Sequence, residues 1–275
     1  MTRRSRLIRE LSILAAVIVV LGIVAFAAER LIFSRRVMTA KIAPSMDDAL
    51  GPLILRQVEL SQRVLSNPGI DAAFATIMDR LRPALDQMAP GAPKIRIVVL
   101  DSPAVNAFAL PGGIICVDTG LIRSLETAEQ MAAILGHELS HVAHRDPLTL
   151  LARQVGAAAL AGVLTGGRGG GGAGTLAQTL VNVHYGREAE DRADAFSVQL
   201  LARAEIQPQA FEQALERIRK AGPADPKLLL WLDTHSPIDE RIARAAQEAS
   251  KLTVTPRRIP VDWHRLTSGL QKSEE

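Results

Sequence analysis

The sequence predicts an α+β fold that is mainly helical, with a small β-sheet and one transmembrane helix ahead of it. Three observations support this fold class. Residues 11–28 form an apolar run without charge, apolar residues recur at helical spacing from residue 46 onward, and two β-rich stretches lie between residues 94 and 120. The predicted segments are a basic N-terminus (1–10), a transmembrane anchor (11–28), a linker (29–45), a folded domain (46–252) and a C-terminal tail (253–275).

The apolar run at 11–28 is long enough to cross a bilayer. As a helix its residues rise about 27 Å, close to the thickness of the hydrocarbon core. A charge-free helix of this length has no polar face for water, so we expect it to contact membrane lipid. The alternative is a cleavable signal peptide, because Ala25 and Ala27 resemble a cleavage site, and this alternative implies a cleaved, secreted form.

Composition and charge limit the remaining function classes. Basic residues flank the apolar run on both sides, so the positive-inside rule, which depends on a difference, does not fix its orientation. The net charge of +3, without a basic stripe interleaved with aromatics, argues against nucleic acid as a partner. Cys116 is the only cysteine, which excludes an intramolecular disulfide and a cysteine-based zinc site.

The first elements of the domain follow from apolar spacing. Apolar residues at helical spacing predict helices over 46–66 and 70–89, with Pro83 placed to kink the second. The stretch Pro-Gly-Ala-Pro at 90–93 ends that helix. The β-rich stretch 94–101 then predicts a strand.

A hairpin-like region and a capped helix come next. Residues 106–120 predict a strand, a Pro-Gly-Gly turn and a second strand over Ile114–Val117, with a helical turn starting at Thr119. Thr127 predicts the N-cap of a helix that runs to about Arg145. The Asp-Pro pair that follows can end this helix or begin the next.

The second half of the domain is predicted to be helical. An apolar, alanine-rich stretch at 148–164 leads to the glycine-rich segment 166–174, which we expect to be a loop. It is not a phosphate-binding loop, because no Gly-Lys-Ser/Thr follows it. Beyond it we expect one long helix and three shorter ones, and a tail with a short strand and a frayed end. These helices cover 175–203, 208–220, 226–233 and 238–250.

The predicted helix after Thr127 contains His-Glu-x-x-His. Residues four apart share a helix face, so His137 and His141 can bind one zinc ion through their imidazoles. Glu138 lies one residue further round, where a general base must be to take a proton from a metal-activated water. The apolar Leu135, Leu139 and Val142 can bury the remaining faces of the helix.

A catalytic zinc ion usually has three protein ligands. His144 is a weak candidate for the third, because a residue one turn further along a straight helix does not converge on the same ion. The better candidates lie in the acidic stretch 185–194, which contains Glu188, Glu190 and Asp194. Glu190 and Asp194 share a helix face, so one can bind the metal while the other orients a ligand histidine. Spacing alone does not choose between Glu188 and Glu190.

Four stretches together resemble a known family. The chain is similar, over roughly residues 50–250, to the membrane-associated zinc metallopeptidases that include HtpX-like proteases, the CAAX prenyl protease and BepA-like proteins. The matching stretches are Asn-Ala-Phe-Ala-Leu-Pro-Gly-Gly (106–113), Gly-His-Glu-Leu-Ser-His-Val-Ala-His-Arg-Asp (136–146), Arg-Glu-Ala-Glu-Asp-Arg-Ala-Asp (187–194) and Thr-His-Ser-Pro-Ile-Asp-Glu-Arg-Ile (234–242). In the last of these, a serine separates His235 from Pro237, which departs from the family's His-Pro pair.

The resemblance implies a zincin-type, gluzincin-like metallopeptidase domain with one catalytic Zn²⁺. It aligns Glu190 as the third ligand beside His137 and His141, and Asp194 as the residue behind a ligand. Glu138 is implied as the general base, and His235 or Arg187 as the donor that stabilises the oxyanion. Substrate is implied to lie along the strand of Ile114, Ile115, Cys116 and Val117, at the edge of the sheet.

The function implied by the resemblance is a zinc-dependent metalloendopeptidase. Its substrates would be misfolded or unassembled polypeptides of the envelope, and its location the bacterial inner membrane, single-pass, with the catalytic domain on the periplasmic side. The alternative is a membrane-tethered chaperone or assembly factor with a structural or silent zinc site. The presence of Glu138 favours the enzyme, because a purely structural site does not need a base.

Overall fold

The computed structural model describes residues 44–164, 172–181, 185–220 and 238–271. These residues belong to one compact unit, 44–275, which is separate from residues 1–43. The predicted anchor at 11–28 and the predicted helix at 226–233 therefore lie outside the described residues. Within the described part, no helix combines the length and the apolar character needed to cross a membrane.

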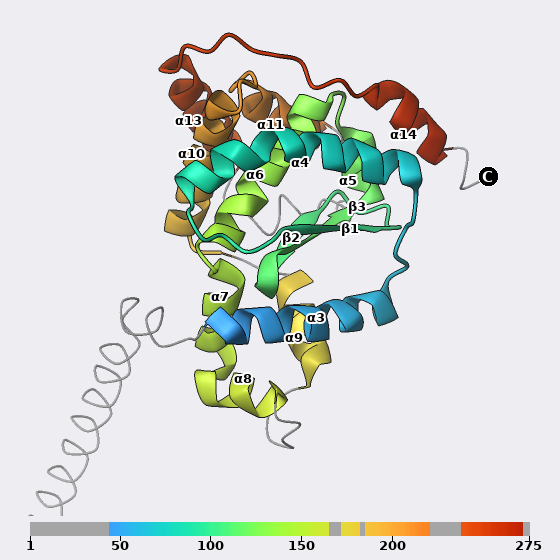
Figure 1. The fold of residues 1–275 in the computed structure, drawn as a ribbon, viewed down its shortest axis with the longest axis vertical. Coiled ribbons are helices and arrows are strands. Elements are labelled where there is room, and N and C mark those ends of the chain that lie inside the picture. The colour runs from blue at the N-terminus through green and yellow to red at the C-terminus, as the bar shows by residue number, and fades with distance from the viewer. Residues whose placement is uncertain (1–43, 165–171, 182–184, 221–237, 272–275) are drawn as a thin grey trace, which may run out of the picture. The chain divides into compact units, whose positions relative to one another are not determined.

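The described chain is mainly helical and carries one small sheet, as predicted (Figure 1). The elements are α3 (Pro44–Ser61), α4 (Pro68–Met88), β1 (Arg96–Leu100), β2 (Ala107–Leu110), the 3-10 turn η1 (Pro111–Gly113), β3 (Ile114–Asp118), α5 (Thr119–Ser124), α6 (Ala128–Ala143), α7 (Asp146–Val155), α8 (Ala157–Leu164), α9 (Ala173–Val181), α10 (Arg187–Arg203), α11 (Ala210–Lys220), α13 (Ile238–Ser250) and α14 (Trp263–Gln271).

The sheet has three strands in the order β1-β3-β2, with β3 parallel to β1 and antiparallel to β2. The prediction that Ile114–Val117 forms the edge of the sheet is therefore wrong, because β3 is paired along both sides. The chain enters β3 from η1, whose Gly112 and Gly113 have φ of 74° and 79°. This left-handed turn, which glycine adopts without strain, folds β3 back between its two neighbours.

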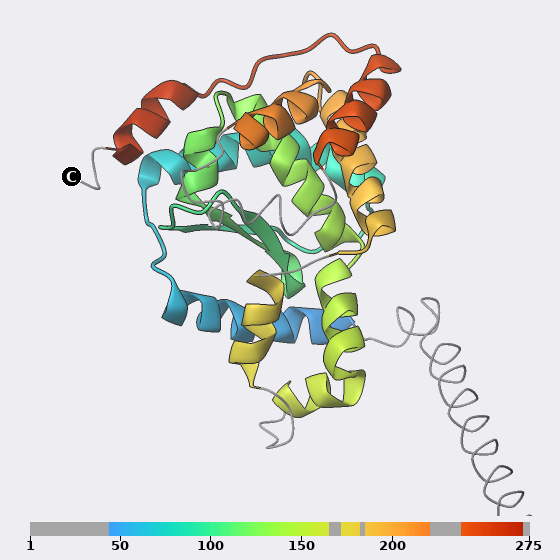
Figure 2. The ribbon, with the colours of Figure 1, turned by 180° about the vertical axis from the view of Figure 1, so that it is seen from behind.

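The sheet lies between two helical layers (Figure 2). Its residues alternate between the layers, as strand geometry requires. On one face, buried residues such as Ala109, Ile115 and Val117 join the main hydrophobic core with α4, α6, α10 and α11. Residues of the opposite parity, such as Phe108 and Cys116, are also buried. Helices α3 and α9 contact the sheet on that side through β2.

Helix α6 passes through the centre of the protein. Thr127 caps it by accepting a hydrogen bond from the Gln130 backbone N–H, and Leu135, Leu139 and Val142 are buried, as the sequence predicts. The helix ends at Ala143, two residues before the predicted end. Arg145 then adopts a left-handed conformation with φ of 52°, and Asp146-Pro147 begins α7.

The predicted single helix over 175–203 is two helices. Helix α9 ends at Val181 and α10 begins after Gly186, whose extended backbone (φ −68°, ψ 149°) interrupts the helical path. Two helices in place of one allow Tyr185 to leave the helical face and contact α6, as described below.

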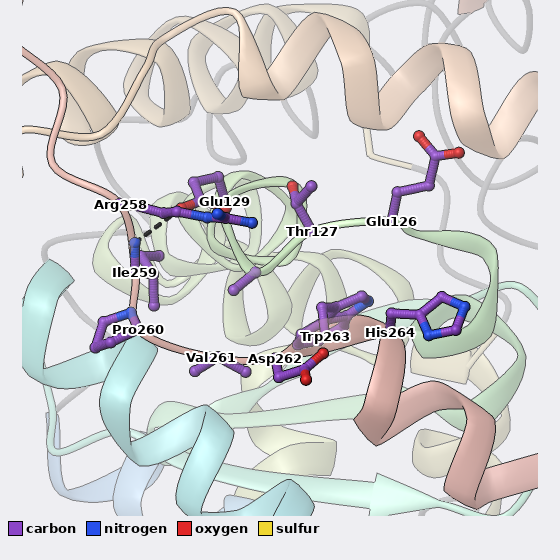
Figure 3. Close-up of a pocket in the computed structure, with 11 residues that line it drawn as sticks. Glu126, Thr127, Glu129, Arg258, Ile259, Pro260, Val261, Asp262, Trp263 and His264 are labelled. Carbon is purple, nitrogen blue, oxygen red and sulfur yellow. Dashed lines mark hydrogen bonds between the residues drawn. The ribbon is translucent and has the colours of Figure 1, made fainter.

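The C-terminal tail packs on the start of α6 (Figure 3). Its backbone N–H at Ile259 donates to a Glu129 carboxylate oxygen at 2.8 Å, and the buried Trp263 indole donates to the Leu125 carbonyl at 3.0 Å. A cavity of about 400 Å³ lies between the tail and the first turn of α6. His137 is nine residues beyond Ala128, about 14 Å along the helix axis, so this cavity is remote from the histidines.

Helices α6 and α10 approach closely at Gly136. A Cβ built on Gly136 would lie 2.8 Å from the Ser197 hydroxyl oxygen and 3.3 Å from the Ser197 Cα. The same hydroxyl donates a 2.6 Å hydrogen bond to the Ala133 carbonyl. The glycine therefore sets the distance between the two helices.

We expect Gly136→Ala to destabilise the protein by about 1–3 kcal/mol, because the added methyl group must push α10 away from α6. Chemical unfolding followed by circular dichroism measures this change. Gly162→Ala is the matched control, since a Cβ at Gly162 in α8 meets nothing within 4 Å. Equal stability of the two variants would contradict the close approach.

Candidate metal centre

Two helices bring the three candidate ligands together. His137 and His141 lie one turn apart on α6, Glu190 lies in the first turn of α10, and all three side chains are fully buried. The two Nε2 atoms are 3.1 Å apart. Glu190 Oε2 lies 3.6 Å from His137 Nε2, and Glu190 Oε1 lies 3.6 Å from His141 Nε2.

These separations fit a single tetrahedral ion. Ligand atoms placed 2.0–2.1 Å from zinc at tetrahedral corners lie about 3.3 Å from one another. The ligand atoms of the three residues all lie within 4.8 Å of one another. Two imidazole nitrogens and one carboxylate are also a donor set typical of catalytic zinc sites.

The hydrogen bonds of the histidines support the same conclusion. His137 Nδ1 lies 2.9 Å from Asp194 Oδ1, and His141 Nδ1 lies 2.9 Å from Asp146 Oδ2. We assign the imidazole protons to Nδ1, where each donates to a carboxylate. Both Nε2 atoms then carry lone pairs that converge with the Glu190 carboxylate in a buried space, and a bound cation would relieve their repulsion. The residues therefore fit a divalent metal ion.

Burial controls the protonation of the ligands. It holds the pKa of His137 well below its ordinary value, and the positive charge of Arg241 lowers it further. Burial also lowers the pKa of His141, although Asp146 opposes this shift. For Glu190, burial raises the pKa to about 9, although Arg241 opposes the shift. The neutral imidazoles are ready to bind a metal, whereas Glu190 needs a nearby cation to ionise.

Arg241 on α13 supplies positive charge beneath the ligands. Its side chain is fully buried, and its Nε and Nη2 atoms donate to the two Asp194 oxygens at 2.9 and 2.6 Å. Its Nη1 lies 3.8 Å from Glu190 Oε2. The resemblance includes an arginine at this point in the fourth stretch, but its role is visible only in three dimensions.

A second ion pair lies behind His141. Asp146, the first residue of α7, accepts from His141 and from Arg192 Nη2, the latter at 2.6 and 2.8 Å. Tyr185 stacks on His141 with ring centroids 4.1 Å apart and planes 21° apart. Periodicity in the sequence assigns no role to these residues, because the left-handed Arg145 and the extended Gly186 that position them interrupt the helical spacing.

The other predicted site residues occupy different surroundings. Glu138 is buried beside His137 on α6, whereas His144 is exposed, with its Nδ1 2.7 Å from the Ser140 carbonyl oxygen. The side chain of Arg187 is 65% exposed and pairs with Glu240 at 3.4 Å. His235 lies outside the described residues.

Comparisons with known proteins identify a peptidase family. Residues 71–249 match the model of peptidase family M48. The chain is 32% identical to a protease HtpX homologue of Acidiphilium cryptum, over 66% of this chain and 78% of that protein. It is 24% identical to the beta-barrel assembly-enhancing protease of Yersinia pestis, over 82% of this chain and 48% of the relative. It is 33% identical to the mitochondrial metalloendopeptidase OMA1 of Bos taurus, over 54% of this chain and 32% of that protein.

The fold and the buried His-His-Glu cluster define a metallopeptidase of the type that carries its ligands on two packed helices. The chain belongs to peptidase family M48, whose members are zinc-dependent metallopeptidases. It spans about half the length of the Yersinia relative and about a third of the bovine one.

We expect zinc to decide whether the parent or the Glu190→Gln variant is more stable near neutral pH. Without metal, the folded pKa of Glu190 is about 9, above its unfolded value of 4.5. Its contribution to stability is thus complete below pH 4.5 and is lost as the pH rises to 9, by up to about 1.4 kcal/mol per pH unit. Metal-free parent protein should therefore lose stability relative to Glu190→Gln over this range.

With zinc, the parent should be the more stable of the two at pH 7 to 8, because the variant lacks an anionic ligand. Denaturant titrations with zinc and with a chelator measure both differences. Glu188→Gln is the control, since Glu188 is exposed on the same turn of α10. If the metal-free parent and Glu190→Gln differ in stability by the same amount at every pH, the raised pKa of Glu190 would be contradicted.

Proposed function

We propose that this protein is a zinc-dependent metalloendopeptidase that cleaves misfolded or unassembled polypeptides of the envelope. The observation that carries the proposal is the convergence of three buried acceptors, from His137, His141 and Glu190, beside the buried Glu138. A structural zinc site has four protein ligands, whereas a catalytic site has three and a neighbouring base. Membership of family M48 supports the same activity.

Each residue has a defined task in amide hydrolysis. His137, His141 and Glu190 would hold the ion, which when bound acts as a Lewis acid on water and on the scissile carbonyl. Glu138 takes the proton of the attacking water and then delivers it to the leaving amine nitrogen. Asp194 and Arg241 hold the His137 ring in the orientation that directs Nε2 toward the ion.

The oxyanion donor is proposed from the side chains around this site. Arg187 is one predicted donor, and to contact the oxyanion its side chain would have to break its ion pair with Glu240. His235, the other predicted residue, remains a candidate. Tyr185 is a third, because its ring stacks on His141 and its buried hydroxyl has no hydrogen-bond partner among the described residues. The kcat of zinc-loaded Tyr185→Phe, Arg187→Ala and His235→Ala variants distinguishes the three.

We propose that substrate binds as an extended strand along β2. The pairing of the Asp118 N–H with the Asn106 carbonyl places the ladder bonds of β2 at even-numbered residues, so Ala107 and Ala109 direct their backbone groups outward. No other strand of the described residues pairs with that side. Strand β2 also packs against α6, which carries the histidines. Methylating successive substrate amides tests this mode, since a paired N–H cannot be replaced without loss of cleavage.

We propose that residues 11–28 anchor the protein in a bacterial inner membrane, with the catalytic domain in the periplasm. The charge-free sequence of this segment supports the anchor, and the resemblance to envelope proteases supports the side. A reporter enzyme fused after residue 45 measures the side directly. We expect periplasmic reporter activity, and cytoplasmic activity would contradict the proposed orientation.

We expect Glu138→Gln to lower the cleavage rate of an unfolded protein such as casein by at least about 100-fold, because the base is lost. Its zinc content should equal that of the parent, because glutamine keeps the size of the side chain and the ligands are untouched. Cleavage of labelled casein and metal analysis of the same preparation measure the two quantities.

The control is the chelator-treated parent, which should lose both zinc and activity. Cleavage by Glu138→Gln at the parental rate would contradict the enzymatic proposal. If neither protein cleaves casein and both suppress its aggregation, the membrane-tethered chaperone would replace the protease.

A further inference from the structure

The two histidine ligands are supported in different ways. Behind His137, Asp194 is held by Arg241, and all three side chains are at most 5% exposed. Behind His141, Asp146 is held by Arg192, whose side chain is 33% exposed. The first support is therefore part of the protein core, whereas the second reaches the surface.

The second support also connects different elements. Asp194 lies on α10, the helix that carries Glu190, and Arg241 on α13 holds it. Asp146 is the first residue of α7, which carries none of the three ligands. Helix α7 contacts α8, α9 and β2 as well as α6. The orientation of His141 is thus tied to the placement of α7.

The backbone between α6 and α7 is shaped for this contact. Arg145 adopts φ 52°, ψ 37°, a left-handed conformation that is unfavourable for a non-glycine residue. This single residue redirects the chain between the C-cap of α6 at His144 and the start of α7. As a result the Asp146 carboxylate reaches back to His141 Nδ1 at 2.9 Å, which a continued helix would prevent.

We propose that Asp146 and Arg192 are a positioning pair for His141, and that through Asp146 the zinc site responds to the placement of α7. The proposal rests on the proposed zinc-binding function. Asp146 fixes the His141 tautomer and ring direction, and Arg192 restrains Asp146 through two short contacts. Neither residue is among the three candidate ligands, so each would act on the ion only through His141.

A double-mutant cycle on zinc affinity tests the pair. We expect Asp146→Ala to weaken zinc binding about 10- to 100-fold, measured by competition with a fluorescent chelator. Arg192→Ala should weaken it less, and Arg192→Lys should recover part of that loss because it restores the charge. In the Asp146→Ala background, Arg192→Ala should cause no further loss, because Arg192 acts only through Asp146.

Asp191→Ala is the matched control. Asp191 is the neighbour of Arg192 on α10 and pairs instead with Arg244 at 2.7 Å, away from His141. We expect its zinc affinity to stay within about twofold of the parent value, as befits a part-exposed ion pair. Unfolding curves with saturating zinc verify that each variant folds, and Arg192→Ala keeps the test valid if Asp146→Ala does not fold.

The proposal would be overturned if Asp146→Ala binds zinc within twofold of the parent affinity. It would also be overturned if Arg192→Ala causes the same loss of affinity with and without Asp146. These measurements need no substrate. If the parent binds zinc but cleaves nothing, the proposed peptidase activity is refuted and the positioning pair stands. If the parent is active and Asp146→Ala leaves zinc affinity unchanged, the activity stands and the positioning pair is refuted.

Discussion

The buried guanidinium of Arg241 is the interaction on which the metal centre depends. Without it, Asp194 and Glu190 would face each other as carboxylates in a space that excludes water, which is costly for either as an anion. With it, Asp194 accepts two hydrogen bonds from the guanidinium and can orient His137. One cation from α13 therefore holds the two ligand helices, α6 and α10, in an arrangement that accepts a second cation between them.

The surrounding fold keeps this arrangement fixed. Gly136 lets α6 and α10 come into contact, and Ser197 joins them through its bond to the Ala133 carbonyl. The sheet supports α6 from one side, and the tail fastens its first turn through Glu129. Ligands that belong to rigid helices lose little freedom when a metal binds, which favours a preorganised site.

Residues with a local signal could be placed from the sequence. The spacing of His137, Glu138 and His141, the Thr127 cap and the Pro-Gly-Gly turn each follow from periodicity or from the conformational preference of one residue type. The three-dimensional neighbours of the site have no such signal. Arg241 reaches His137 from 104 residues away, and Asp146 depends on one left-handed residue that breaks a helix. The strand order also escaped prediction, because alternation shows which faces are buried and does not show which strand is central.

The long sequence separations around α6 have a consequence for the order of synthesis. A nascent chain that has emerged as far as Arg203 already contains both histidines, Glu138 and Glu190. It still lacks Arg241, which compensates the buried carboxylates, and Ile259 and Trp263, which fasten the start of the ligand helix. The metal centre is therefore completed by residues that the ribosome adds after both ligand helices, so we expect a chain that ends at Arg203 to contain the ligands without the contacts that organise them.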